Sequence, residues 1–213
     1  MSGFESYLER IFQDHCPYLG RARAAGALRI WDYSDAPLLR AEELPPLGCF
    51  HTELLRRDRS SAANATTGLL CCAVLVLPNC PGLRHALGQT HFILKRIYTT
   101  RGLLFGKFWP GQALIGETGR PVADPPQPIL VLRSSLPRRD LRFFEKKSRP
   151  FRNDYLTARD DGTPNSTGLR IPPAALAQRL VSLRPDTPAA DRVSLARALY
   201  ALAPLLQLLE PAQ

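Results

Sequence analysis

The sequence lacks an apolar run long enough to cross a membrane. Its longest run, from Gly68 to Pro78, spans eleven residues, whereas a membrane-spanning helix needs about 20. The first residues, Met1 to Glu5, also lack the apolar segment of a secretory signal peptide. We therefore expect a cytoplasmic protein that makes no contact with a membrane.

Cysteine and histidine are too few and too irregularly spaced to predict a structural zinc site. The five cysteines include no C-x-x-C pair, and adjacent Cys71 and Cys72 would point to opposite faces of a strand. An odd number of cysteines without a secretion signal favours reduced thiols. Of the four histidines, His85 and His91 share a predicted helix but lie six residues apart, whereas two ligands on one helical face need a spacing of three or four.

The apolar content is sufficient for a core, since 45% of the 213 residues are hydrophobic, and the length fits one domain. Periodicity predicts helices over 3–14, 49–57 and 82–98, and strands over 27–33, 69–77, 103–108 and 129–133. Strands and helices alternate, so the predicted class is α/β, with α+β as the alternative. We expect a single domain, 1–213, built around a mixed sheet.

The centre of the predicted fold is the strand over 69–77, which is continuously apolar, as expected of a strand buried on both faces. The helix over 82–98 and the strand over 103–108 follow with short joints and predict a right-handed, parallel crossover. Residues 34–48 contain three prolines and predict mostly loop, and the small polar residues of 59–67 predict a connection.

The C-terminal part predicts a flexible loop over 156–172 and a helical pair over 173–209. The second helix, from about 188, carries leucines around much of its circumference. Such a helix packs in a core or against another subunit, so we expect a homo-oligomer formed through it.

The formal net charge is +9, and eight of the 28 Lys and Arg residues lie between residues 133 and 152, interleaved with phenylalanines. Three interpretations remain open: a solvated face, a site for a small anionic or amino-acid-like ligand, or a nucleic-acid surface. Nucleic acid is the least favoured, because no nucleic-acid module is recognisable. Arg138, Arg139 and, outside this segment, Lys107 are the predicted anion-binding residues.

Several single residues are candidates for a site. Cys16 and Cys80 each precede a proline, and a helix N-terminus would stabilise the Cys80 thiolate for metal binding or nucleophilic attack, the alternative being a buried, inert thiol. His91 borders the apolar stripe of its helix, as either a satisfied core residue or a ligand that faces a cleft. Trp109 follows the carboxyl end of a predicted strand, where ligands of parallel sheets bind, and could form a pocket wall.

Three stretches carry a family resemblance. They are Cys16-Pro17-Tyr18 followed by Gly26 to Arg29, Leu94-Lys95 followed by Gly102 to Pro110, and Pro128 to Arg133 followed by Asp140 to Phe144. Over residues 14–155 the chain is thereby similar to a bacterial domain family of unknown function that is found near natural-product genes. That family distantly resembles YqcI/YcgG-type proteins, some of which are haem-dependent N-oxygenases.

The resemblance implies haem as a cofactor, but the histidine that would ligate the iron is replaced by Trp109 in this chain. Two alternatives follow: either the iron ligand is His91 or Cys16, or this member of the family does not use haem in that way. If haem binds, Arg133, Arg138 or Arg139 would hold its propionates or a substrate carboxylate. The resulting hypothesis is a biosynthetic redox enzyme that oxidises a small amine or amino acid. The alternative is a non-catalytic binding or assembly protein that uses its basic face for an anionic partner.

Overall fold

The computed structural model describes residues 2–34, 41–80, 82–116, 119–136, 139–141, 144 and 149–160. Its helices are α1 (Ser2–Asp14), α2 (Pro17–Ala24), α3 (Leu44–Ser60), α4 (Ala65–Leu70), α5 (Leu83–Tyr98) and α7 (Arg152–Leu156), with short 3-10 helices η1 (Ala41–Glu43), η2 (Thr99–Arg101) and η3 (Arg149–Phe151). Its strands are β1 (Leu28–Asp32), β2 (Cys72–Val76), β3 (Leu103–Phe108) and β4 (Ile129–Ser134).

The four strands form one mixed sheet in the order β1-β2-β4-β3. β1 and β2 are parallel, whereas β4 runs antiparallel to both β2 and β3. The edge strands of this sheet are therefore β1 and β3. The predicted class, a single α/β domain around a mixed sheet, is confirmed.

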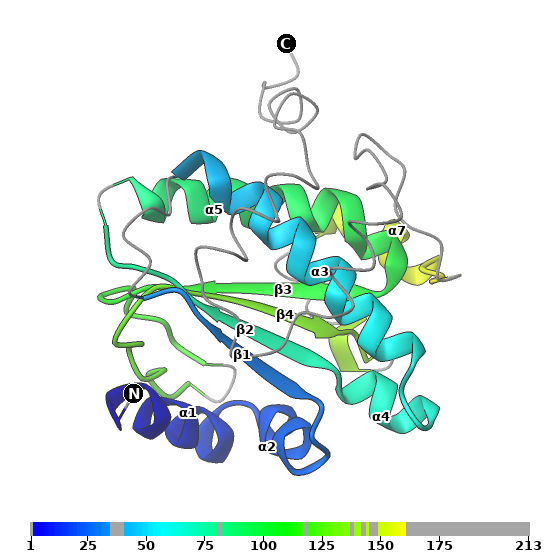
Figure 1. Cartoon of the computed structure of the whole chain (residues 1–213), viewed down its shortest axis with the longest axis horizontal. Coiled ribbons are helices and arrows are strands. Elements are labelled where there is room, and N and C mark those ends of the chain that lie inside the picture. The colour runs from blue at the N-terminus through cyan, green and yellow to red at the C-terminus, as the bar shows by residue number, and fades with distance from the viewer. Residues whose placement is uncertain are drawn as a thin grey trace.

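Helices cover both faces of the sheet (Figure 1). Helices α3 and α5 lie on one face, which we call the α3–α5 face, and helices α1 and α2 lie on the other, the α1–α2 face. Side chains alternate along each strand, so Trp31, Leu75 and Phe105 enter the core under α3 and α5, whereas Val74 and Val76 pack against α1 and α2.

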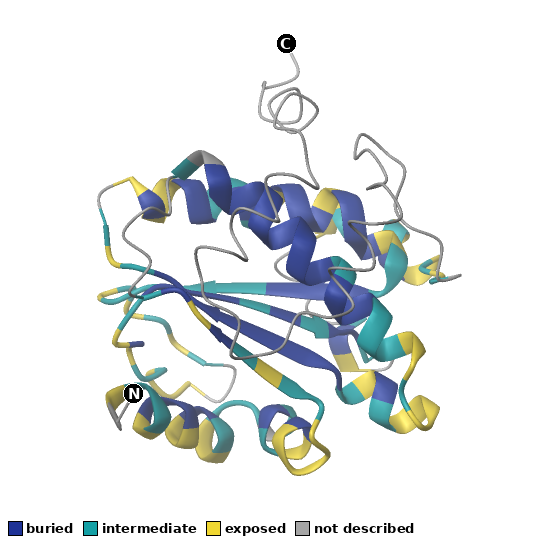
Figure 2. Cartoon of the chain, in the orientation of Figure 1, coloured by how far each residue is buried: buried dark blue, intermediate teal, exposed yellow. Residues whose placement is uncertain are grey.

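β2 is the buried centre of the sheet, and all five of its residues are inaccessible to solvent (Figure 2). The predicted burial on both faces is confirmed: Cys71 packs into the core of the α3–α5 face and Cys72 into that of the α1–α2 face. The strand is shorter than the predicted 69–77, because residues 65–70 form helix α4 instead.

Two helices correct the predicted boundaries. The side-chain oxygen of Asn64 accepts a hydrogen bond from Thr67 N at 2.8 Å and so caps the N-terminus of α4. Leu69 lies in this helix and not in the buried strand, and it is 42% exposed. α3 is longer than the predicted 49–57 and contains Pro45 and Pro46 in its first turn. Proline is tolerated there because the first turn of a helix needs no backbone donors.

The predicted crossover is present, but its two strands are not neighbours. β2 and β3 point in the same direction, because each is antiparallel to β4, which lies between them. The parallel neighbours are β1 and β2, which α3 and α4 connect. Local sequence patterns do not predict this arrangement, because β4 joins the sheet after a long loop over 109–128.

Most of the other predicted helices and strands are confirmed, whereas the predictions for the C-terminal segment are not tested. Helix α1, strand β1 and strand β4 lie where they were predicted, whereas α2 was not predicted. The helical pair over 173–209 and most of the loop over 156–172 lie outside the described residues. The five cysteines form no disulfide, and no described helix is both long and apolar enough to span a membrane.

Candidate functional site

The sheet separates the predicted site residues into two groups. His91 on α5 and Lys107 and Trp109 at the end of β3 lie on the α3–α5 side. Cys16, at the start of α2, packs against the core of the α1–α2 face. The structure therefore does not bring Cys16 together with His91.

His91 is engaged by the edge strand β3. Its Nε2 lies 3.1 Å from the carbonyl oxygen of Phe105, and burial together with the charges of Lys95 and Lys107 lowers the pKa of His91 to about 4. The imidazole is therefore neutral at pH 7 and donates its Nε2 proton to this carbonyl. This geometry matches the interpretation of His91 as a satisfied core histidine.

Arg133 is part of a structural ion pair. Its guanidinium donates two hydrogen bonds to the carboxylate of Asp140, at 2.8 and 2.6 Å, and the same carboxylate accepts a bond from Leu136 N. The crevice beside Arg133 measures only about 10 Å³, which holds one water at most. Arg133 thus fixes the chain after β4, and its guanidinium is already paired with the carboxylate of Asp140.

The other predicted anion-binding residues lie apart from one another. Arg139 is exposed, and its guanidinium carbon lies 5.3 Å from the ring centroid of Tyr18. Lys107 lies on the opposite side of the sheet, next to Trp109. Arg138 lies outside the described residues.

The implied haem ligands do not fit one site. His91 and Cys16 lie on opposite sides of the sheet. If His91 Nε2 bound the iron, the carbonyl oxygen of Phe105 would lose the hydrogen bond that Nε2 donates to it. His91 and Cys16 line none of the three cavities described for this chain. Within the described ranges, no group of three or more His, Cys, Asp or Glu residues is placed to hold a metal ion.

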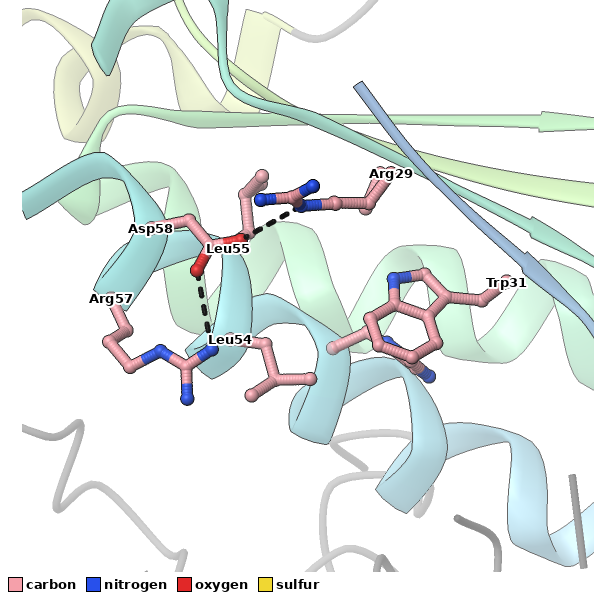
Figure 3. A pocket seen from close by; sticks show the side chains of 8 residues that line it. Arg29, Trp31, Leu54, Leu55, Arg57 and Asp58 are labelled. Atoms are coloured by element: carbon pink, nitrogen blue, oxygen red, sulfur yellow. Dashed lines mark hydrogen bonds and ion pairs between the residues drawn. The ribbon is translucent and has the colours of Figure 1, made fainter. Parts of the chain in front are cut away.

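A cavity of about 140 Å³ opens between the edge strand β1 and helix α3 (Figure 3). Its wall is mainly apolar and aromatic, and it is formed by Trp31, His51, Leu54, Leu55 and Ala73. Its rim is charged and consists of Arg29, Arg57 and Asp58. The cavity thus combines an apolar interior with charges of both signs at the mouth.

The wall of the cavity is rigid because His51 is held from several sides. Nε2 of His51 lies 2.6 Å from the hydroxyl oxygen of Tyr33. The rings of Trp31 and Phe50 lie 4.9 and 5.0 Å from its imidazole. All four side chains are buried, and aromatic contacts of this kind add to the stability gained from burial alone.

The rim places one carboxylate between two arginines. Asp58 Oδ1 lies 3.3 Å from a terminal nitrogen of Arg57, and its Oδ2 lies 3.7 Å from Nε of Arg29, as the dashed lines of Figure 3 show. The Arg29 and Arg57 side chains are 50% and 39% exposed. Contacts this long and this exposed contribute little to stability, so these groups can re-pair with a ligand.

A larger cavity, of about 340 Å³, lies near the start of β3 and is lined by Arg59, Tyr155 and Asp160. Its charged groups are already satisfied. Arg59 donates to the carbonyls of Arg101 and Gly102 and pairs with Asp160, and Asp160 also accepts two bonds from Arg56. These buried pairs hold α3 to the chain after α7, so we favour the smaller cavity as the site.

None of the residues that line this cavity was among the site residues predicted from the sequence. Strand alternation places Arg29 and Trp31 on the same face of β1, and a spacing of 0, 3, 4 and 7 places His51, Leu54, Leu55 and Asp58 on one stripe of α3. Both patterns could have been read from the sequence. That the two stripes face each other follows only from the packing of α3 over β1.

A family model, the domain of unknown function DUF6875, matches residues 14–167, which is well over half of the chain. The chain belongs to the DUF6875 family. The DUF6875 span includes all four strands, helix α3 and every residue that lines the cavity between β1 and α3. No curated protein and no solved structure is significantly similar to the chain.

Proposed function

We propose that the protein binds a small zwitterionic ligand of the amino-acid type in the cavity between β1 and α3. The observation that carries this proposal is the placement of Asp58 between two arginines at the mouth of an apolar cavity. The ligand's ammonium group would pair with Asp58, its carboxylate with Arg57 or Arg29, and its side chain would lie against Trp31.

The size of the cavity supports a small ligand. Its volume of about 140 Å³ lies well below the roughly 300 Å³ at which pockets for drug-sized ligands begin. An amino acid with a short aliphatic side chain matches both the volume and the apolar wall. A nucleotide or a haem is too large for it.

The charges at the rim support a ligand that carries both signs. Hydrogen bonds between ionised groups are stronger than neutral ones, whereas the present contacts of Asp58 with Arg29 and Arg57, at 3.7 and 3.3 Å, are long for charge-assisted bonds and partly exposed to solvent. A bound zwitterion would replace two weak internal contacts by two shorter ones. A purely anionic or purely cationic ligand would leave Asp58 or the arginines with a like-charged neighbour.

The test uses intrinsic fluorescence, because the chain contains only two tryptophans. Trp109→Phe leaves Trp31, in the cavity wall, as the only reporter. We expect L-valine or L-leucine to change its emission saturably, and Asp58→Asn to weaken binding about tenfold, the effect of losing one charge-assisted bond. Asp14→Asn, at the end of α1 on the opposite face, is the matched control and should bind as the parent does.

The binding proposal is contradicted if no amino acid produces a saturable change, or if Asp58→Asn and Asp14→Asn bind equally well. In either case the rim does not select a zwitterion. Far-UV circular dichroism of each variant shows whether a loss of binding reflects a loss of fold.

The finer hypothesis, haem-dependent oxidation of the bound amine or amino acid as in the YqcI/YcgG-type proteins, stays a prediction, as does the natural-product context. It predicts a Soret band after expression with a haem precursor, and a shift or loss of that band in His91→Ala or Cys16→Ala. A protein that remains colourless after haemin titration contradicts it.

The alternative of an assembly protein with a basic face also stays a prediction. It predicts salt-dependent binding to a polyanion that weakens when Arg138, Arg139, Lys146 and Lys147 are neutralised. Unchanged affinity of that variant counts against it.

A further inference from the structure

Two cations and an indole ring gather at the second edge of the sheet, away from the β1 cavity. The guanidinium carbon of Arg84, in the first turn of α5, lies 4.7 Å from the ring centroid of Trp109. The ammonium nitrogen of Lys107, on β3, lies 5.5 Å from the same centroid. We call Arg84, Lys107 and Trp109 the β3-edge cluster.

The cluster has donors but no acceptor. Across the part of the chain that the structure describes, no carboxylate lies within ion-pair distance of Arg84 or Lys107, and the buried indole nitrogen of Trp109 has no hydrogen-bond partner. Asp124, in the loop after Trp109, instead accepts a bond from Gly111 N at 3.2 Å. Both cations thus contact the indole ring, and no described carboxylate balances their charge.

Arg84 is exposed and Lys107 is partly exposed, whereas the more buried arginines Arg56 and Arg133 are paired with carboxylates. Arg56 pairs with Glu53 and Asp160, and Arg133 pairs with Asp140. Within the described part of the chain, no carboxylate pairs with Arg84 or Lys107. Cation–π contacts orient a cation but leave its charge in place, so the positive charge of the cluster remains available to a partner.

The surroundings add positive charge and allow access. Lys95, on the same helix, has its pKa lowered by burial and by the charge of Lys107, which places a third cation in the same field. Gly88 leaves room for the Lys107 side chain, whose ammonium lies 3.4 Å from where a Cβ at that position would stand. Among the described strands β3 lies at the edge of the sheet, and Arg84 is exposed to solvent.

We infer that the β3-edge cluster is a binding site for a phosphate group, separate from the proposed amino-acid cavity. A phosphate dianion matches two adjacent cations better than a single carboxylate does, and arginine binds phosphate oxygens through two parallel hydrogen bonds. In this site the guanidinium of Arg84 and the ammonium of Lys107, both in contact with the Trp109 ring, would bind the phosphate oxygens. The source of the group is inorganic phosphate or the phosphate of a small organic ester.

Trp109 serves as its own reporter in the test. Trp31→Phe leaves Trp109 as the only tryptophan, and its emission is followed against inorganic phosphate, phenyl phosphate and acetate at constant ionic strength. We expect saturable changes with one or both phosphates and none with acetate. Stronger binding of phenyl phosphate identifies an ester as the ligand, and equal or weaker binding identifies inorganic phosphate.

Two variants decide whether the cluster is responsible. Arg84→Gln and Lys107→Gln should each weaken phosphate binding roughly tenfold or more, since each removes one charge-assisted contact. Arg96→Gln removes an exposed cation from the last turns of the same helix and should leave the affinity unchanged. A linear response to phosphate, an equal response to acetate, or the same affinity in all three variants overturns the inference.

Thermal unfolding of proteins that retain Trp31 shows whether the Trp31→Phe substitution itself alters phosphate binding. Phosphate that binds the folded state raises the thermal midpoint with phosphate concentration, and it should do so less in Lys107→Gln than in Arg96→Gln. An equal rise in both variants also overturns the inference. Amino-acid binding is measured by the fluorescence of Trp31 and phosphate binding by that of Trp109, so either proposal can fail without the other.

Discussion

The hydroxyl oxygen of Tyr33 lies 2.6 Å from Nε2 of His51, and both side chains are buried. Tyr33 follows β1, and His51 belongs to α3. The hydrogen bond therefore ties the edge strand to the helix that covers it, directly behind the wall of the candidate cavity. The shape of the cavity depends on this contact as well as on the apolar packing around it.

Tyr33→Phe tests the contribution of that hydrogen bond. The substitution keeps the ring but removes the hydroxyl, so a buried imidazole nitrogen loses its partner. We expect the free energy of unfolding to fall by about 1–3 kcal/mol, measured by urea denaturation. Tyr18→Phe is the matched control, because Tyr18 is only partly buried, and a similar loss in both variants would contradict a special role for the Tyr33–His51 bond.

Asp140→Asn tests the structural role of Arg133. The carboxylate of Asp140 accepts two bonds from Arg133 and one from Leu136 N, and removing its charge leaves a largely shielded guanidinium unpaired. We expect a loss of about 2–4 kcal/mol in the free energy of unfolding. A loss below about 0.5 kcal/mol, as for an exposed pair, would mean that Arg133 remains available for a ligand.

The sequence predicted the fold where local patterns decide it. The amphipathic stripe of α1, the alternation in β1 and the spacing in α5 are each visible within one segment. The boundary between α4 and β2 is not, because the apolar run passes through it unbroken. The helix there depends on the Asn64 cap and on Gly68, where a Cβ would lie 3.0 Å from the carbonyl oxygen of Arg59.

The candidate site was harder to predict because its parts are distant in sequence. Trp31 and His51 were placed correctly on a strand and a helix, but their meeting depends on α3 crossing over β1. The separation of His91 from Cys16 likewise depends on which face of the sheet each helix covers. Sequence patterns within one segment do not show which face of the sheet a helix will cover.

The low pKa of His91 predicts a specific dependence of stability on pH. Burial lowers this pKa to about 4, whereas the unfolded chain binds the proton at about 6.5. Between these values the unfolded state holds a proton that the folded state lacks. This contribution to stability is therefore complete above about pH 6.5, falls as the pH drops towards 4, and levels off below it.

We expect this term to amount to about 2–3 kcal/mol between pH 7 and pH 4, and to disappear in His91→Gln, whose amide can still donate to Phe105 O. Urea denaturation at several pH values measures the difference between the two proteins. His85→Gln, on an exposed position of the same helix, is the control. An NMR titration midpoint of His91 near 6.5 would refute the prediction.

The cysteines should differ in reactivity. Burial raises the pKa values of Cys49, Cys71 and Cys72, the last to about 12, whereas Cys16 and Cys80 are partly exposed. Because the thiolate is the reactive form, a thiol reagent at pH 8 should modify at most Cys16 and Cys80 rapidly in the folded protein, and all five in denaturant. Mass spectrometry identifies the modified residues, and early labelling of Cys72 would contradict the described packing.

The most direct test of the central claim is a thermodynamic cycle between Asp58 and the ammonium group of the ligand. Affinities of L-valine and N-acetyl-L-valine are measured by calorimetry for the native protein and for Asp58→Asn. If Asp58 holds the ammonium group, N-acetylation should weaken binding at least tenfold in the native protein and by less than threefold in Asp58→Asn. An equal loss in both proteins, or no binding of valine to either, would contradict the account.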